Sequence, residues 1–294
     1  LCCGLLAFAY FVWSLASGRR SRRIERLSLV PLAGTAALLT ASMALRGYAA
    51  GHLPLGNGYE TMIFVAWCLS LLALGIGRRF PISAASGLLM SGFALLVASL
   101  GMANPQITPL VPVLRSPWLS LHVSLIMVSY ALLGLNGTAA LALAAAARAG
   151  TAERTSRTLA RLRLFGRLLL YPAVFLLTAG IFTGAVWANA SWGRYWGWDP
   201  KEVWALITLI VYALPLHEQS LARFRRPLFF HAYTLWAFAA VLMTYFGVNY
   251  LLGGMHSYGG GFRPGYAAAT VFAAVTAFAL LTVAALIRQR RTDA

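Results

Sequence analysis

The sequence predicts an all-α, polytopic helical membrane protein with about nine transmembrane helices. Of its 294 residues, 60% are hydrophobic and only 11% are charged, whereas a soluble domain carries roughly a quarter charged residues. The hydrophobic residues form blocks of about 17–30 residues, long enough to cross a hydrocarbon layer of roughly 30 Å as helices. The spans of a β-barrel would be shorter and would alternate strictly between apolar and polar residues.

The predicted spans follow one another along the chain with short polar connections. They cover approximately residues 1–17, 28–46, 61–77, 83–102, 118–147, 168–190, 203–217, 229–250 and 267–287. The seventh is short, and the fifth is long enough to tilt or to extend beyond the membrane. The first block lacks a basic segment and a cleavage site, so we interpret it as a true span with further sequence upstream. We treat residues 1–294 as a single integral membrane domain.

The net charge of +17 is concentrated in the connections between spans. If the spans simply alternate, 19 basic residues fall on one side of the membrane and five on the other. Because cytoplasmic loops carry the excess of Lys and Arg, we predict an external N-terminus and an external segment 187–204. This explanation of the charge requires no nucleic acid, and we predict no nucleic-acid partner.

Acidic residues are few and lie outside the middle of the spans. The chain has seven Asp and Glu in total, whereas proton- or ion-coupled carriers usually need carboxylates inside the membrane. This disfavours ordinary secondary transport. The sequence also lacks a phosphate-binding GxxxxGK[ST] motif and a GxSxG nucleophile motif, and its three cysteines lack metal-ligand spacing.

Five of the nine tryptophans lie within residues 187–204, here called the Trp-rich segment. They are Trp187, Trp192, Trp196, Trp198 and Trp204. Anchoring helices at a membrane interface requires only a few aromatic residues at each end. The cluster therefore predicts a flat apolar surface at the external face, suited to a large planar ligand.

Two acids in the Trp-rich segment have the spacing of a helix start. Asp199, Pro200 and Glu202 match the N-cap, first and third positions of a capping box. A purely structural role and a ligand-contacting role are both open for Asp199 and Glu202. The basic residues Arg194 and Lys201 could pair with propionate groups, and interfacial placement of their charges explains them equally well.

Histidines on the predicted external face suggest what the planar ligand is. His122 and His256 flank the Trp-rich segment in sequence and lie on its side of the membrane. Neutral imidazole is a common axial ligand of haem iron, although a single interfacial His is more often a hydrogen-bonding group at a helix end. Two histidines on one face beside five tryptophans could hold a haem, and at this point a haem site and a structural role are both open. His217 ends the seventh span on the cytoplasmic side.

Four stretches of the chain resemble haem-handling proteins of cytochrome c maturation. Residues 184–205 resemble their Trp-rich "WWD" signature, and residues 57–67, 122–133 and 246–259 also match. Within that group the chain is similar to the CcsA/ResC-type subunit of system II. It departs from the usual pattern by continuing for 35 residues beyond Gly259, which adds the ninth span.

The resemblance implies transport of haem b to the external face and its presentation for covalent attachment to apocytochrome c. It implies His122 and His256 as external axial ligands, His217 as an intramembrane ligand, and the Trp-rich segment with Asp199 and Glu202 as cofactor-binding residues. It also implies a bacterial inner membrane, a ResB/CcsB-type membrane partner and thioredoxin-like thiol reductants. His52 and His231 match no ligand position.

We interpret the chain as the haem-presenting subunit of a cytochrome c haem lyase and assign no catalytic residue. Two alternatives are open. One is a system I-type protein that delivers haem to a haem chaperone. The other is a haem-free polytopic carrier or scaffold, whose tryptophans are interfacial anchors only.

Overall fold

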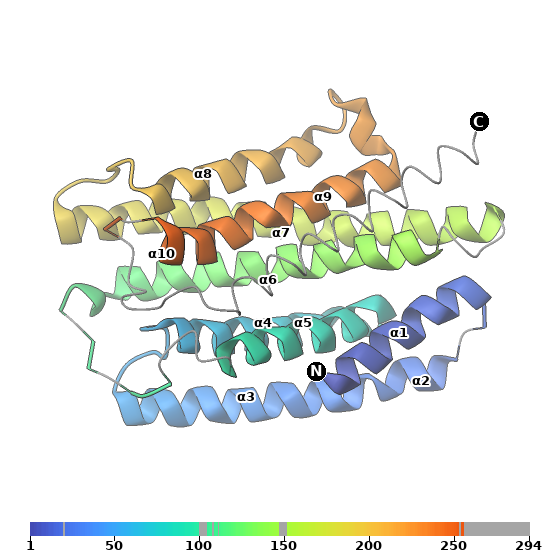
Figure 1. Ribbon diagram of the computed structural model, residues 1–294, viewed down its shortest axis with the longest axis horizontal. Coiled ribbons are helices and arrows are strands. Elements are labelled where there is room, and N and C mark those ends of the chain that lie inside the picture. Colours follow the sequence, from blue (N-terminus) through green and yellow to red (C-terminus); the bar gives the residue numbers. More distant parts are fainter. Residues whose placement is uncertain are drawn as a thin grey trace.

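The computed structural model describes residues 1–19, 21–99, 105–107, 109–110, 112–146, 152–252 and 254–255. Every regular element in these ranges is helical (Figure 1). Eight of the nine predicted spans correspond to helices, and the ninth, 267–287, lies outside the described residues. Among the described residues, six helices are long and apolar enough to cross a membrane, so the chain is a multi-pass membrane protein.

The helices have the following bounds. They are α1 (Cys2–Ser17), α2 (Arg22–Leu27), α3 (Leu29–Ala50), α4 (Gly58–Gly77), α5 (Pro81–Ser99), α6 (Pro117–Ala146), α7 (Ala152–Trp192), α8 (Pro200–Ala213), α9 (Pro227–Leu242) and α10 (Val248–Leu251). Short 3-10 helices cover Pro112–Leu114, Leu214–His217 and Ala222–Arg225. A π-helical turn, Met243–Gly247, joins α9 to α10.

Helix α7 is longer than the sequence predicts. The predicted span 168–190 marks its apolar part, but the helix begins at Ala152 and continues through Pro172 to Trp192. The reason is that Arg, Leu and Ala, which are frequent in residues 152–167, favour a helix even where charge lowers the hydropathy. Hydropathy therefore located the part of α7 suited to the membrane, but placed the start of the helix too late.

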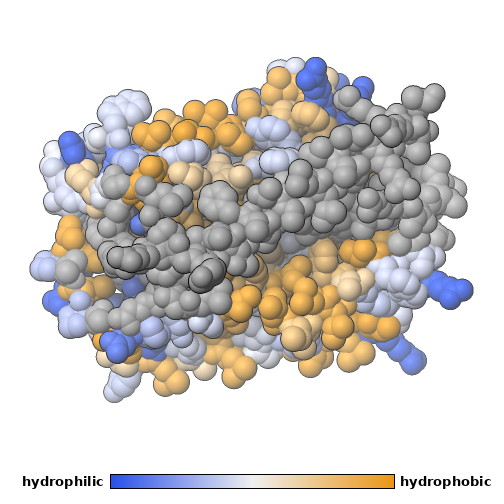
Figure 2. Space-filling view, viewed as in Figure 1, coloured by the Kyte–Doolittle hydropathy of each residue, from blue (hydrophilic) through white to orange (hydrophobic). Residues whose placement is uncertain are grey.

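The helices form an elongated bundle in which most elements run lengthwise (Figure 1). Helices α6 and α7 occupy the middle of the view, with α8 and α9 on one side and α3, α4 and α5 on the other. Their shared core contains the fully buried side chains of Leu133, Phe165, Leu177, Tyr212 and Phe230. Apolar residues gather around the middle of the visible face and hydrophilic residues at both ends (Figure 2), as expected for a bundle that crosses a membrane.

The two ends of the bundle differ in chemistry. The Arg-bearing turns around 19–26, 78–79 and 223–226 lie at one end, and the Trp-rich segment lies at the other (Figure 1). At the Arg-bearing end, Glu218 accepts ion pairs from Arg163 at 2.6 Å and Arg167 at 2.8 Å. These contacts hold the turn after α8 against α7.

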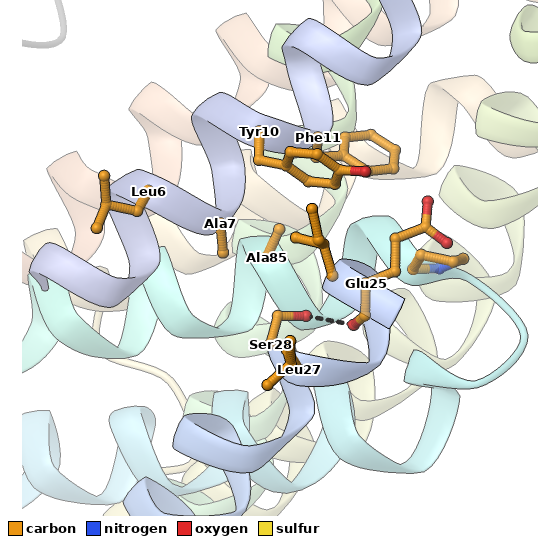
Figure 3. A pocket seen from close by; sticks show the side chains of 10 residues that line it. Leu6, Ala7, Tyr10, Phe11, Glu25, Leu27, Ser28 and Ala85 are labelled. Carbon is orange, nitrogen blue, oxygen red and sulfur yellow. Dashed lines mark hydrogen bonds between the residues drawn. The ribbon is translucent and has the colours of Figure 1, made fainter. Parts of the chain in front are cut away.

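A cleft of about 310 Å³ opens at the Arg-bearing end between α1, α2 and α5 (Figure 3). Its walls are mostly apolar and include Leu6, Phe11 and Ala85, with the hydroxyl of Tyr10 and the carboxylate of Glu25 as polar groups. The Tyr10 hydroxyl accepts a hydrogen bond from the backbone N–H of Ser21 at 2.8 Å. The cleft lies away from the Trp-rich segment and is not part of the site described below.

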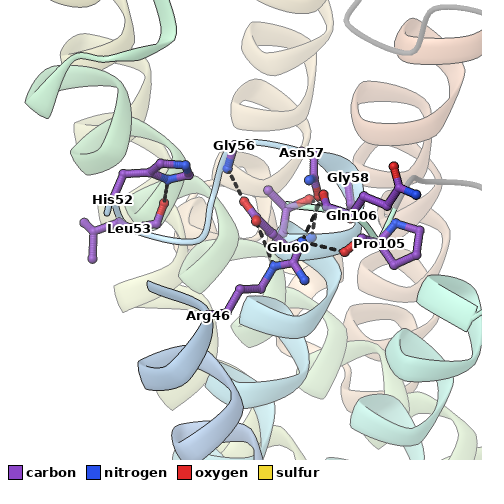
Figure 4. A network of polar contacts seen from close by, with 10 residues as sticks. Arg46, His52, Leu53, Gly56, Asn57, Gly58, Glu60, Pro105 and Gln106 are labelled. Carbon is purple, nitrogen blue, oxygen red and sulfur yellow. Dashed lines mark hydrogen bonds and ion pairs between the residues drawn. The ribbon is translucent and has the colours of Figure 1, made fainter. Parts of the chain in front are cut away.

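A buried ion pair joins the loops at the Trp-rich end (Figure 4). The Arg46 guanidinium at the end of α3 lies 2.8 Å from Glu60, whose side chain is only 3% exposed. Arg46 also donates to the carbonyl of Pro105 at 2.7 Å, and Glu60 accepts from the N–H of Gly56 at 2.7 Å. Asn57 caps α4 by accepting from the N–H of Glu60. The Arg46–Glu60 ion pair thus connects the loop before α4 and the loop after α5 to the bundle.

We expect Glu60→Leu to lower the free energy of unfolding by about 3 kcal/mol, because it leaves the Arg46 charge without its carboxylate. Thermal unfolding of the purified protein in detergent measures this loss. The matched control is the double variant Arg46→Leu/Glu60→Leu, which removes both charges and should be more stable than Glu60→Leu alone. Equal midpoints for the two variants would contradict a dominant role for the ion pair.

Candidate functional site at the Trp-rich end

The Trp-rich segment consists of two helix ends and the connection between them. Trp187 and Trp192 lie in the last turns of α7, and Trp204 lies in α8. Only Trp196 and Trp198 lie in the connection. Gly193 ends α7 with a φ of 73°, a left-handed conformation that glycine adopts without steric cost.

The indole rings do not form the single flat surface that the sequence suggested. Trp187 and Trp192 meet edge to face at 4.8 Å, with 67° between their planes. The ring centroids of Trp196 and Trp198 lie 5.9 Å apart, with 90° between the ring planes. Trp187 is only 1% exposed, and its indole N–H donates to the carbonyl of Val113 at 3.2 Å. Edge-to-face contact is the usual preference of neighbouring aromatic rings, so the cluster is a stepped surface supported by Trp187 from within.

Trp198 is held in an unfavourable backbone conformation with its ring in the open. Its φ is 57°, and its side chain is 72% exposed. A non-glycine residue with positive φ stores strain of roughly 1–2 kcal/mol, and such residues gather at functional sites. Glu202 stabilises this conformation, because one of its oxygens accepts from the N–H of Gly197 at 2.8 Å and from that of Asp199 at 3.1 Å.

The predicted capping box at the start of α8 is confirmed. Asp199 is the N-cap and accepts from the N–H of Lys201 at 3.0 Å, and Glu202 completes the box. The second Asp199 oxygen accepts from the N–H of Met255 at 2.7 Å. Asp199 and Glu202 therefore have structural roles, and a direct contact of either with a ligand stays a prediction.

The same helix start is tied to α10 by side chains. The Lys201 ammonium donates to the side-chain carbonyl of Asn249 at 2.8 Å, and a guanidinium N–H of Arg194 lies 3.2 Å from the sulfur of Met255. Lys201 precedes the predicted span 203–217. Burial lowers the pKa of its ammonium to about 8, against the opposite effect of the Asp199 carboxylate. Both basic side chains near the Trp residues thus already have hydrogen-bond partners within the protein.

His122 lies in the first turns of α6, against α7. Its Nδ1 lies 2.6 Å from the carbonyl oxygen of Gly180, so Nδ1–H is the donor and Nε2 is the nitrogen that carries a lone pair. A Cβ atom at Gly184 would lie 2.5 Å from Nδ1 of His122, and one at Gly180 would lie 2.6 Å from Ile126. Sequence reasoning missed these glycines. Their GxxxG spacing, which permits close helix packing in membranes, was the available signal.

Of the three predicted haem-ligating histidines, the structure describes His122 and His217, which were assigned to an external and an inner site. His122 lies at the Trp-rich end, and His217 ends the 3-10 helix at the Arg-bearing end. The 14 residues of α8 that separate the two ends span roughly 20 Å. His256 lies outside the described residues. Within the described part of the chain, no group of three or more His, Cys, Asp or Glu side chains could hold a metal ion.

The two remaining histidines, which match no predicted ligand position, lie in different surroundings. His52 Nδ1 donates to the carbonyl of the adjacent Leu53 at 2.9 Å (Figure 4). His231 is fully buried in α9, close to Asn136 of α6 across Gly166 of α7. The polar side-chain atoms of His231 and Asn136 have no hydrogen-bond partner among the described residues. The sequence did not indicate this polar pair in the core, because the two residues are 95 positions apart in the chain and only helix packing brings them close.

Comparison with known proteins identifies the family. The model of the cytochrome C assembly protein family matches residues 55–256. The chain belongs to this family. The matched interval contains the whole Trp-rich segment and all three histidines predicted to ligate haem, His122, His217 and His256.

Relatives in this family carry cytochrome c biogenesis names. The protein CcsA of Synechococcus sp. (strain WH7803) is 36% identical over 305 residues, covering 87% of this chain and 93% of that protein. CcsA of Prochlorococcus marinus (strain MIT 9303) is 35% identical over 292 residues, covering 87% and 90%. Protein NrfI of Wolinella succinogenes is 42% identical over 228 residues, which are 76% of this chain but only 25% of NrfI.

These similarities make the chain a CcsA-type member of the cytochrome c assembly family, with a role in cytochrome c biogenesis. They confirm the family resemblance of the sequence motifs. Membership also implies that the protein handles haem. The chain spans about a quarter of the length of NrfI, so the activity of that longer protein as a whole is not transferred to it.

We expect Gly184→Ala to lower the free energy of unfolding by about 1–3 kcal/mol through overpacking, because the added methyl would meet the imidazole of His122. Thermal unfolding in detergent measures the effect. The matched control is Gly137→Ala in α6, where the nearest atom, on Leu235, would lie at 3.8 Å.

A second background tests the cause of the loss. In a His122→Ala chain the clash is removed, so Gly184→Ala should cost clearly less. An equal cost in both backgrounds would contradict close packing of His122 on Gly184.

Proposed function

We propose that this protein receives haem b within the membrane, holds it at the external face and presents it for covalent attachment to apocytochrome c. In this role it is the haem-presenting subunit of a cytochrome c haem lyase in a bacterial inner membrane. The external axial ligands are His122 and His256, and the Trp-rich segment binds the porphyrin.

The observation that carries the proposal is the orientation of His122. Ligating histidines almost always donate their second ring N–H to a carbonyl, carboxylate or water, which fixes the tautomer and the ring. His122 has this arrangement, because its Nδ1–H donates to the carbonyl of Gly180 at 2.6 Å. Because Nδ1–H donates to Gly180, coordination of iron falls to Nε2 in this proposal. The hydrogen bond is formed at the Trp-rich end of the bundle, where the sequence predicts the haem.

The tryptophans supply the apolar surface that a porphyrin needs. Trp192, Trp196 and Trp204 are partly exposed, and Trp198 is mostly exposed. Exposed indoles surrounded by polar loops are typical of a binding surface. Trp187 is buried and supports Trp192 from behind. In this proposal, packing of the Trp198 ring against haem offsets the energetic cost of its strained backbone.

An inner site and a partner complete the proposed path. His217 ends the 3-10 helix after α8, at the Arg-bearing end, and is exposed there. Glu218, the residue after His217, is held to α7 by its ion pairs with Arg163 and Arg167. We propose that a ResB/CcsB-type subunit supplies the second ligand beside His217. The excess of Arg at this end of the bundle supports a cytoplasmic position for His217 under the positive-inside rule.

The chemistry requires positioning more than acid–base catalysis. Thioether formation adds a cysteine S–H across a haem vinyl group, so that sulfur and hydrogen bond to its two carbons without net oxidation or reduction. Thioredoxin-like reductants keep the apocytochrome cysteines reduced. Two axial histidines would protect the iron until the apocytochrome's own histidine displaces one, and the Trp surface would orient the vinyl edge.

Absorption spectra of the purified protein, co-expressed with its partner, test the proposal. We expect a bis-histidine haem spectrum in the wild type that is distorted or lost in His122→Ala and in His256→Ala. Added imidazole should restore it in both, because a free ligand can occupy the vacated axial position. His52→Ala is the matched control and should leave the spectrum unchanged. In His217→Ala we expect lower haem loading with the external spectrum retained.

Three outcomes would contradict the proposal. A colourless wild type under haem-replete conditions would favour a haem-free scaffold with interfacial tryptophans. A normal spectrum that is insensitive to His122→Ala would place the haem elsewhere. Transfer of the haem to a haem chaperone, and not to apocytochrome c, would favour the system I-type alternative.

The strain at Trp198 gives an independent prediction. We expect Trp198→Gly to raise the free energy of unfolding of the haem-free protein by about 1 kcal/mol, because glycine adopts positive φ without cost. The same change should weaken haem retention, measured by transfer of haem to apomyoglobin. Trp13→Gly, at an exposed tryptophan of α1, should not weaken retention. If Trp198→Gly retained haem as the wild type does, Trp198 would be no part of the site.

A further inference from the structure

We propose that Asp199 is a positioning residue, whose carboxylate holds the backbone next to His256 in place. The inference rests on the proposed function, since it assigns to Asp199 the placement of one external haem ligand. It differs from the prediction that Asp199 itself contacts haem. The contact that carries it is the hydrogen bond from the N–H of Met255 to Oδ2 of Asp199, here called the Asp199 tie.

The Asp199 tie is short and buried. It measures 2.7 Å, and Asp199 is only 5% exposed. Hydrogen bonds to an ionised group are roughly twice as strong as neutral ones. The other oxygen, Oδ1, caps α8 through the N–H of Lys201, so one carboxylate joins the start of α8 to a segment 56 residues further along the chain.

The approach of the two segments requires a glycine. A Cβ atom on Gly254 would lie 2.4 Å from Oδ2 of Asp199 and 3.1 Å from Pro200. Any other residue at 254 would push the chain away from the carboxylate. Met255 immediately precedes His256 in the sequence, so the tie anchors the residue directly before the proposed ligand.

The segment from the π-helical turn to Met255 is also held at two earlier points. Tyr245 shares a hydrogen bond with Thr61 of α4, and Thr244 shares one with Thr208 of α8 at 3.0 Å. Further along, Asn249 accepts from the Lys201 ammonium at 2.8 Å. π-helical turns frequently occur at functional sites. The Asp199 tie is the last of these contacts before His256 and thus the one with most control over it.

The test must distinguish the hydrogen bond to Met255 from the capping of α8, because Asp199 makes both. Asp199→Ser keeps an oxygen that can cap α8, since Ser is among the preferred N-cap residues, but it removes the second oxygen that Met255 needs. Asp199→Ala removes both functions. If only the cap mattered, the Ser variant would behave as the wild type. If the tie matters, Ser and Ala variants should share the same defect in haem ligation.

The first readout does not depend on haem. Hydrogen–deuterium exchange, followed by mass spectrometry of the peptide containing Met255, should become faster in Asp199→Ser by about ten-fold or more, the factor for losing a hydrogen bond to a charged group. A peptide from the core of α6 serves as the internal control. Unchanged exchange at Met255 would overturn the tie, whatever the colour of the protein.

The second readout is axial ligation in the presence of the partner. Asp199→Ser should lower the bis-histidine fraction, and added imidazole should restore it, as for His256→Ala. Haem retention, measured by transfer of haem to apomyoglobin, is then compared in single-ligand backgrounds. In a His256→Ala background Asp199→Ser should have no further effect on retention, whereas in a His122→Ala background, where His256 is the remaining proposed ligand, it should. Additive losses in both backgrounds would instead assign Asp199 a direct haem contact and overturn the positioning role.

The two proposals fail in different ways. A colourless wild type with faster exchange in Asp199→Ser would refute haem binding and retain the tie as structure only, which overturns the placement of a ligand by Asp199. A bis-histidine wild type whose spectrum Asp199→Ser leaves unchanged would refute the inference alone.

Discussion

The close packing of α6 on α7 is the constraint on which the rest of the structure depends. Gly180 and Gly184 let the two helices approach until His122 lies directly against the α7 backbone. In a lipid environment, contact of this kind replaces the hydrophobic driving force that is absent between apolar helices. Helix α7 runs from the Arg-bearing end to the Trp-rich end. Contact with α7 therefore fixes the position of His122 relative to both ends of the bundle.

A few carboxylates hold the connecting segments in place at the two ends of the bundle. Of the seven acidic residues, Glu60, Asp199 and Glu202 hold loops at the Trp-rich end, and Glu218 holds the turn beside His217. Each accepts from more than one donor. A chain with so little charge thus uses it at the two places where irregular backbone must keep a defined shape.

The sequence predicted the main parts of the molecule because they depend on local signals. Hydropathy located eight helices, and the spacing of Asp199 and Glu202 identified the capping box that the structure confirms. The start of α7 was missed, since hydropathy reports the membrane and not the helix. The flat Trp surface was also wrong, because ring angles depend on side chains such as Trp187 that turn into the core.

By itself, the sequence determined the class of the protein, the order of its spans, its family and which histidines to consider. Composition, periodicity and motif spacing are properties of the chain, and they need no partner in space. Only the tertiary structure decided that His122 donates to Gly180, that Glu202 accepts from both neighbours of Trp198, and that Asp199 reaches Met255. These contacts join residues distant in sequence or depend on backbone angles, and packing of the helices alone brings such groups within hydrogen-bonding distance.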